Sequence, residues 1–288
     1  MSLAFSQSTA DVLVPDGLDP ASALARTTHL GIGAHQDDLE FMAYAGIAEC
    51  FGRPDAWFAG VTCTSGAGSS RSGPYARHTD EQMRTLRREE QRAAARAGRY
   101  AAMLQLDFAS AELQTPAGLA ALTADLRTLL ATMRPRVIYT HNPADKHNTH
   151  TAVFRAVLAA VRAWSAEPGV AGRAASPQFL GCEVWRGLDW LPDEEKVLLD
   201  CSPRPELADQ LFGCYASQIA GGKRYDLAVR GRWAANATLL APRAGDTSSA
   251  IAYAMDLAPL RKDPSLDPAA FVEGKLRGLA TEVHRQLS

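Results

Sequence analysis

Short apolar runs alternate with longer amphipathic segments along the first part of the chain. The apolar runs predict strands at residues 29–34, 57–64, 100–108 and 137–140. The segments that follow them place apolar residues at helical spacing and predict helices at residues 41–50, 80–97, 119–133 and 151–164. Strictly alternating strands and helices indicate a parallel sheet that is covered by helices on both faces.

The pattern changes after Pro168. Residues 178–201 predict two strands around the turn at residues 191–193, and residues 205–219 and 223–235 predict helices. We therefore expect an α/β fold, a Rossmann-like, mostly parallel sheet with a smaller C-terminal α+β elaboration. The expected organisation is a lead-in segment at 1–26, a core at 27–168 and a C-terminal extension at 169–288, with the junction at 169–176.

Charge and composition exclude several classes of protein. The 288 residues carry a formal net charge of −2. The chain therefore lacks the excess of basic residues that is typical of nucleic-acid-binding proteins. The arginines between residues 84 and 99 have helical spacing, which is typical of a solvated helix face. No apolar run reaches the length of a membrane span, and the N-terminal residues lack the pattern of a signal peptide. We expect no membrane insertion and a cytoplasmic location, with the five scattered cysteines reduced.

The first cluster of polar residues follows the predicted strand at 29–34. His35 and Asp38 are three residues apart across a turn, close enough to bind one ion, and Asp37 lies between them. Ligands of open α/β sheets bind at the carboxyl ends of strands, which is where this cluster stands. The alternative is that the aspartates only cap the helix that follows.

The second cluster follows the predicted strand at 137–140. Three of the seven histidines, His141, His147 and His150, fall within ten residues there, together with Asp145. The same topology places this loop at the same edge of the sheet as the first cluster. A lone histidine would more often be structural, but three beside an aspartate indicate a site.

Histidine and aspartate ligands are typical of a catalytic zinc site, in which three protein ligands leave a position for water. Such a site needs a base near the water and a donor for the leaving amine. Asp37 and His147 are available for these two roles. Asp145, two residues before His147, is placed to orient the His147 imidazole.

The two clusters resemble the signatures of the PIG-L/LmbE-like family of zinc-dependent N-acetylglucosamine deacetylases. The first family motif reads Ala-His-Pro-Asp-Asp-x-Glu, and this chain has Ala34 to Glu40 in that place. The second is often Asp-x-His-Pro-Asp-His, and this chain has Asp145 to His150. The similarity covers residues 28–163 with matching order and spacing.

The resemblance implies a ligand set and a reaction. His35, Asp38 and His150 would bind one zinc ion per chain, Asp37 would be the general base, and His147 would act as acid or stabilise the transition state. The implied function is removal of an acetyl group from an N-acetylated, sugar-like substrate by attack of metal-bound water. The small-molecule partner is then an N-acetylated sugar conjugate, and the oligomeric state stays open, a homo-oligomer included.

The chain departs from the family motifs at three positions. Gln36 replaces a proline, Thr149 replaces an aspartate, and Ala67 stands where many relatives carry glutamate. The Ser- and Gly-rich loop at 65–79 is expected to line the pocket, with Arg71 as a candidate for binding an anionic group of the substrate. Arg88, in an Arg-Glu-Glu helix that the family also has, is a second candidate for substrate binding.

Two other functions are compatible with the same residues. One is a metal-dependent phosphoesterase, and the other is a metal-bearing sugar-binding protein without turnover. Release of acetate from N-acetylated glycosides would favour the deacetylase and release of phosphate the phosphoesterase. Tight metal binding without turnover would favour the binding protein.

Overall fold

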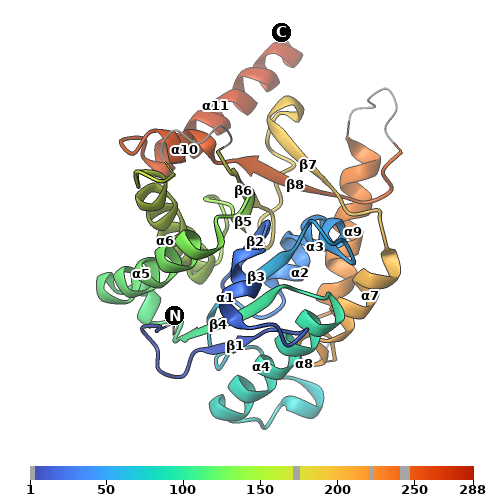
Figure 1. The fold of residues 1–288 in the computed structure, drawn as a ribbon. Helices are drawn as coiled ribbons and strands as arrows, with labels where there is room; N and C mark the ends of the chain where they lie inside the picture. The colour runs from blue at the N-terminus through green and yellow to red at the C-terminus, as the bar shows by residue number, and fades with distance from the viewer. Residues whose placement is uncertain (1–3, 171–175, 221–222, 241–246) are drawn as a thin grey trace.

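The computed structural model describes residues 4–170, 176–220, 223–240 and 247–288, and its centre is a single mixed sheet. Eight strands of the described residues pair in the order β1-β4-β3-β2-β5-β6-β8-β7 (Figure 1). In chain order they are β1 (Asp11–Leu13), β2 (His29–Gly33), β3 (Phe58–Thr64), β4 (Ala102–Phe108), β5 (Val137–His141), β6 (Gln178–Cys182), β7 (Lys196–Asp200) and β8 (Ile251–Asp256).

The middle of the sheet is parallel and its two ends are antiparallel. Strands β4, β3, β2, β5 and β6 run in the same direction, whereas β1 is antiparallel to β4 and β8 is antiparallel to both β6 and β7. The central parallel strands are almost entirely buried, as expected for strands that are covered on both faces. The predicted α/β fold with a mostly parallel sheet is therefore confirmed.

Helices cover both faces of the sheet, and each set contributes to its own apolar cluster. One cluster takes side chains from α1 (Pro20–Ala25), α5 (Pro116–Met133), α6 (Asn148–Ser165), α10 (Ala258–Lys262) and α11 (Pro268–Leu287). The other takes them from α2 (Asp38–Met42), α3 (Tyr44–Cys50), α4 (Asp80–Ala97), α7 (Pro205–Gly213) and α9 (Tyr225–Leu239). The short α8 (Ala216–Ile219) contacts α4 and α9 (Figure 1).

Several local expectations differ from the structure. The helix predicted at 41–50 begins earlier, at Asp38, and is interrupted at Ala43, whose backbone is not helical. The two strands predicted within 178–201 are not neighbours, because β8, which the sequence pattern did not predict, lies between them. Residues 1–26 contain β1 and α1. Of the predicted junction at 169–176, residues 171–175 lie outside the described residues.

The pairing of β2 with β5 brings the two polar clusters together. The strands are parallel and in register from His29 opposite Val137 to Ile32 opposite Thr140. Strands β2 and β5 therefore end at the same edge of the sheet. Strand β2 continues into the loop with His35, and β5 continues into the loop with His147. The expected edge of the sheet is confirmed as the place where the clusters meet.

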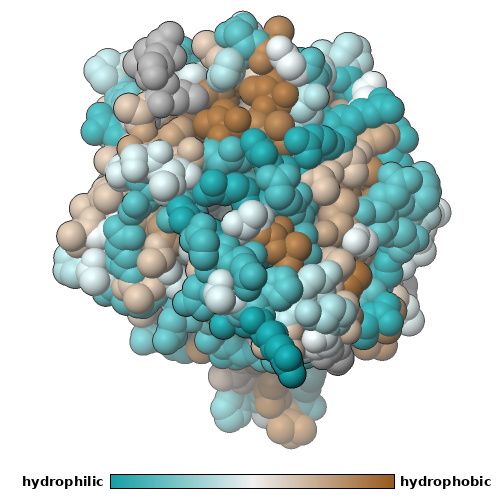
Figure 2. Space-filling model, turned by 90° about the horizontal axis from the view of Figure 1, so that it is seen from below, coloured by the Kyte–Doolittle hydropathy of each residue, from teal (hydrophilic) through white to brown (hydrophobic). Residues whose placement is uncertain are grey.

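One face of the molecule is mostly hydrophilic. On the face seen from below in Figure 2, hydrophilic side chains cover most of the area and apolar side chains gather in smaller, separate groups. Within the described ranges, no helix is both long enough and apolar enough to cross a membrane.

Trp164 tests how strongly α6, the helix that carries His150, depends on the core. Its side chain is completely buried, and its indole N–H has no hydrogen-bond partner within the described part of the chain. Trp164→Ala should lower the free energy of unfolding by about 3–5 kcal/mol because it leaves a large cavity. Trp164→Phe should cost clearly less, since it keeps a ring and removes an unsatisfied donor.

The measurement is urea denaturation of each variant. Leu287→Ala is the control, because Leu287 is 83% exposed and its truncation should change stability by no more than about 0.5 kcal/mol. Equal losses for Trp164→Ala and Leu287→Ala would show that α6 is not anchored by this side chain.

Candidate metal centre and active site

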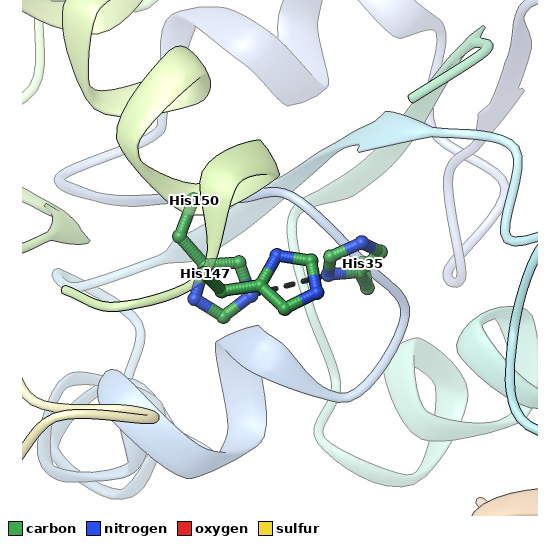
Figure 3. Close-up of side chains that lie close together, drawn as sticks. All are labelled: His35, His147 and His150. Carbon is green, nitrogen blue, oxygen red and sulfur yellow. Dashed lines mark hydrogen bonds between the residues drawn. The ribbon is translucent and has the colours of Figure 1, made fainter. Parts of the chain in front are cut away.

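Three side chains from the two clusters converge at the edge of the sheet. His35 Nδ1 lies 3.2 Å from His150 Nε2, and Asp38 Oδ2 lies 3.5 Å from His35 Nδ1. Asp38 Oδ1 lies 3.5 Å from His150 Nε2. Figure 3 shows the imidazoles of His35, His147 and His150 gathered together, with the contact between His35 and His150 dashed.

The two imidazole nitrogens are spaced for one small divalent ion, and each lies near a different oxygen of Asp38. Among the described residues, the groups whose donor atoms all lie close together are His35 with His147 and His150, and Asp38 with His141 and His150. Ligand atoms bonded to a tetrahedral ion at about 2.0–2.2 Å are roughly 3.3–3.6 Å apart, close to the 3.2–3.5 Å observed. Two imidazole nitrogens and one carboxylate oxygen are also a donor set that zinc accepts. The set leaves room for a further ligand, because His35 and Asp38 line an open cavity.

The negative charge of Asp38 is held in place by its surroundings. Its side chain is almost completely buried, which alone would raise its pKa, but the nearby His150 and His141 hold the pKa well below its usual range. Asp38 Oδ2 also accepts the backbone N–H of His35 at 2.6 Å. The carboxylate therefore stays ionised and oriented towards the two histidines.

Asp145 orients a different histidine from the one expected. Its carboxylate lies 3.3 Å from Nδ1 of His150, not against the ring of His147, and it also accepts the backbone N–H groups of His147 and Trp185. A carboxylate behind a histidine fixes the ring tautomer and makes the other nitrogen a better ligand. The prediction that Asp145 orients the imidazole of His147 is wrong, because the backbone turns His150 towards it.

His141 comes close to the same group of atoms but is engaged elsewhere. Its Nε2 accepts the backbone N–H of Ala34 at 2.9 Å and lies 3.4 Å from Asp38 Oδ2. Its ring stacks on that of His150, with centroids 3.9 Å apart. Because the Nε2 lone pair is already used by Ala34, we expect His141 to support the site and not to bind the ion.

His147 stands at the mouth of the site. It is the N-cap of α6, and its Nδ1 accepts the backbone N–H of Thr149 at 3.3 Å. This bond leaves Nε2 as the nitrogen that can carry a proton. Its ring lies 5.0 Å from that of His35 and lines the cavity. Burial and the neighbouring histidines lower the pKa of His147 to about 4.

Asp37 occupies an unusual backbone conformation. Its φ is 99°, in the region that favours glycine. Holding a residue other than glycine in this conformation costs of the order of 1–3 kcal/mol. The side chain lines the cavity next to Asp38. Burial raises the pKa of Asp37 to about 6, although the Arg87 guanidinium opposes this shift. A buried carboxylate with such a pKa has the properties of a general base.

Arg87 is the functional residue that the sequence pattern missed. The arginines between 84 and 99 were expected on a solvated face, but Arg87 is only 1% exposed. Its guanidinium bonds Asp37 Oδ2 and Glu90 Oε2, both at 2.9 Å, and also the backbone carbonyl of Gln36. An Arg-x-x-Glu pair on a helix is the only sequence signal for this arrangement, and it is common on exposed helices.

Glu90 extends this ion pair to the C-terminal part of the chain. Its carboxylate accepts the backbone N–H of Ser217 at 2.7 Å and the Ser217 hydroxyl at 2.8 Å. Ser217 belongs to α8, and the neighbouring Gln218 lines the cavity. The chain of contacts from Asp37 through Arg87 and Glu90 to Ser217 therefore connects the candidate base with a segment from the far end of the sequence.

The two predicted substrate-binding arginines lie outside the cavity lining. Arg71 donates to the carbonyl of Ala67 and pairs with Asp80. Arg88 donates to the carbonyl of Thr9 and pairs with Asp107 at 3.2 Å. Their guanidinium groups are thus engaged within the protein, and the structure gives no support for either as a substrate ligand.

Gln36 fills the place of the family's proline with a buried side chain. Its amide donates to the carbonyl of Thr64 at 3.0 Å and to Gln105 Oε1 at 3.3 Å. A Cβ on Gly66, whose φ is +72°, would lie 2.3 Å from Gln36 Oε1. Gln36 therefore fixes the start of the loop at 65–79, and its side chain leaves room only for glycine at position 66.

The cavity in front of these residues has a volume of about 650 Å³ and walls from both parts of the chain. Its N-terminal wall includes Gly66, Gly68, Ser69 and Ser70, which confirms that the loop at 65–79 lines the pocket. The C-terminal part supplies the opposite wall: Val184, Trp185, Gln218, Lys223, Tyr225, Ala228, Val229 and Arg232.

Comparison with known families assigns the part of the chain that holds both clusters. The family model described as GlcNAc-PI de-N-acetylase, or PIG-L, matches residues 30–161. Residues 30–161 are called the PIG-L region below. A comparison with curated protein sequences found no match.

Solved structures share the fold over about 80% of the chain. The 4-carboxy-2-hydroxymuconate hydratase GalB of Pseudomonas putida KT2440 has a TM-score of 0.60 and 18% identity, covering 80% of this chain and 95% of its own. The N,N'-diacetylchitobiose deacetylase of Pyrococcus horikoshii has a TM-score of 0.61 and 14% identity, with coverages of 80% and 83%. The A40926 pseudoaglycone deacetylase Dbv21 has a TM-score of 0.54 and 18% identity, with coverages of 80% and 97%.

These likenesses cover more of the chain than the PIG-L region does. At such low identities the likenesses concern the fold alone. The similar structures include a hydratase and two deacetylases, so they do not agree on one reaction. The chemistry of the site, and not the fold, decides the reaction.

The metal centre in the PIG-L region can be tested by its metal content. His35→Ala, Asp38→Asn and His150→Ala should each reduce bound zinc from about one ion per chain towards zero, because a site with three protein ligands loses most of its affinity with any one of them. The measurement is metal content after dialysis, by mass spectrometry. His284→Ala, on the exposed side of α11, is the control and should retain the ion. Loss of zinc in His141→Ala but not in His35→Ala would assign the site to the other histidine.

The buried arginine can be tested by stability. Arg87→Met leaves Asp37 and Glu90 buried without their cation and should lower the free energy of unfolding by about 3–5 kcal/mol. The matched control is Arg96→Met, on the same helix with an exposed side chain, which should change it by no more than about 0.5 kcal/mol. The measurement is chemical denaturation, and equal effects of the two substitutions would contradict the buried ion pair.

Proposed function

We propose that this protein is a zinc-dependent N-deacetylase that removes the acetyl group from an N-acetylated sugar conjugate. The observation that carries the proposal is the convergence of His35, Asp38 and His150 beside Asp37 at the base of an open cavity. This group lies within the PIG-L region, whose family description names a de-N-acetylase. We propose zinc because two imidazoles and one carboxylate with an open position are a frequent catalytic zinc site.

The metal ligands, Asp37 and Arg87 have different roles in the proposed reaction. A zinc ion bound at His35, Asp38 and His150 would supply Lewis-acid activation of water and of the amide carbonyl. Asp37 accepts the proton of the attacking water and can deliver it to the leaving amine, which takes the C–N bond electrons as the bond breaks. Arg87 holds the Asp37 carboxylate in the orientation that this requires.

His147 complements Asp37 from the other side of the site. Its Nδ1 is occupied by the N–H of Thr149, so its Nε2–H can donate a hydrogen bond to the carbonyl oxygen as negative charge develops there. Asp145 contributes indirectly, by keeping His150 oriented. The exposed indole of Trp185 and the size of the cavity suit a sugar ring that carries a further group.

The activity is tested with N-acetylated glycosides as substrates. Incubation of the zinc-loaded protein with aryl N-acetylglucosaminides should release free acetate and the corresponding amine, which a coupled acetate assay detects. Phosphate release from aryl phosphates with no acetate release would favour a phosphoesterase. Stable zinc binding without turnover of either substrate would favour a binding protein.

The roles of the two neighbouring aspartates can be separated. Asp37→Asn cannot accept a proton but removes no proposed ligand, so it should keep its zinc while kcat falls by about 10²–10⁴. Asp38→Asn should lose zinc first and recover part of its activity when zinc is added. The measurement is zinc content and kcat for the two variants side by side. Retention of full activity by Asp37→Asn would contradict its role as base, and loss of zinc from Asp37→Asn alone would reverse the two assignments.

A further inference from the structure

The C-terminal helix α11 is held against the body along one side. Phe271 is buried in the apolar cluster that also takes side chains from α5 and α6. Lys275 pairs with Glu195 at 2.7 Å, and a Cβ on Gly278 would lie 3.8 Å from the ring of Pro192. Positions 271, 275 and 278 share one side of a helix, because they are four and three residues apart. In Figure 1, α11 runs outward from the body and ends, at the label C, beyond the other elements.

A second side of α11 is apolar and faces solvent. Leu276, Val283 and Leu287 are 48%, 44% and 83% exposed. They belong to a row in which successive members are three or four residues apart, called the α11 stripe below: Ala269, Val272, Leu276, Ala280, Val283 and Leu287. Single exposed apolar side chains are ordinary, but a continuous row of them along a helix is typical of an interaction surface.

Ionisable residues flank the α11 stripe on both sides. With a rotation of about 100° per residue, Glu273 and His284 fall on one flank, and Lys275 and Glu282 fall on the other. Each flank thus carries an acidic residue near one end of the helix and a basic residue near the other. The two members of each pair are equally far, in residues, from the point midway between positions 278 and 279.

This pattern makes α11 complementary to a second copy of itself. A two-fold axis at the midpoint, perpendicular to the helix, sets two helices antiparallel and brings equal flanks together. Lys275 of one copy then faces Glu282 of the other, and Glu273 faces His284. In a parallel pair the opposite flanks would meet, and Lys275 and Glu282 would face apolar members of the stripe, so these ion pairs would not form.

The α11 stripe fits the same antiparallel arrangement. Its members then meet in three kinds of pair, to within two residues of the axis: Leu276 with Ala280, Val272 with Val283 and Ala269 with Leu287. Helices pack closely when large side chains face small ones. At about 1.5 Å per residue, the 20 residues of α11 span about 30 Å. The two bodies therefore lie at opposite ends of the pair and do not collide.

We propose that the α11 stripe binds the same stripe of a second copy of this chain, as an antiparallel pair of helices. The occupant is a second copy because the stripe and both flanks complement themselves about one axis. The mixture of acidic and basic flanks also distinguishes α11 from the basic helices that lie on anionic membranes. A pair of single helices is a small interface compared with the roughly 1,200–2,000 Å² of a stable complex, so the dimer is weak and forms in the micromolar range. The dimer does not depend on the reaction proposed above, since the cavity lining of the described residues includes no side chain of α11.

Sedimentation equilibrium of the full chain tests the pair directly. Between about 1 and 100 µM, concentrations that bracket a micromolar dissociation constant, the average mass should rise from near that of one chain towards that of two. A mass that stays at that of one chain over this range overturns the proposal.

Substitution in the stripe locates the contact on α11. Leu276→Glu places two carboxylates in the apolar interface and should raise the Kd of the dimer by more than about tenfold. The matched control is Leu227→Glu, because Leu227 is similarly exposed, at 55%, but lies on α9. Both positions are exposed, so both variants should fold. An unchanged Kd in Leu276→Glu, or an equal loss in Leu227→Glu, overturns the assignment to α11.

The antiparallel arrangement is tested by exchanging charges. His284→Glu sets a carboxylate against Glu273, and because every contact occurs twice in a symmetric pair, the Kd should rise about fivefold. Adding Glu273→Lys in the same chain restores opposite charges and should return the Kd to near its original value. Glu273 and His284 are used because Lys275 already pairs with Glu195 in its own chain. No change in His284→Glu, or no recovery in the double variant, overturns the antiparallel arrangement.

Discussion

The parallel pairing of β2 with β5 is the constraint on which the rest of the site depends. The two strands are more than a hundred residues apart in the sequence, yet their register places the loop after one beside the loop after the other. His35 and Asp38 come from the first loop and His150 from the start of the helix after the second. A shift of one residue in this pairing would turn these side chains to the opposite face and separate the donor atoms.

Charge compensation accounts for the polar residues around the centre. Burying carboxylates and imidazoles side by side is costly unless each has a partner. Arg87 forms ion pairs with Asp37 and Glu90. The Asp145 carboxylate contacts the His150 ring, and the backbone N–H of Ala34 donates to His141. These contacts come from different elements, so the site is stable only when β2, β5 and α4 are all in place. The strained backbone of Asp37 is held by the same contacts.

The C-terminal part of the chain forms one wall of the cavity. Strands β6 and β8 continue the central sheet, and α8 and α9 stand in front of its edge. Through Ser217 this part is joined to Glu90 and Arg87, and through Trp185, Lys223 and Arg232 it forms the wall opposite the glycine-rich loop. The residues of the proposed reaction thus lie in the PIG-L region, while much of the cavity wall lies outside it.

The sequence by itself determined the alternation of strands and helices, the position of the two polar clusters at one edge of the sheet and the candidate metal ligands. These features follow from local periodicity and from the handedness of strand–helix–strand connections, which a single sequence records. Tertiary structure alone decided that Arg87 is buried while Arg88 is not, that Asp145 supports His150, and that β8 separates β6 from β7. It also decided which residues after position 178 reach the cavity. Each of these depends on contacts between segments far apart in the chain, and no local pattern specifies which partner a side chain meets.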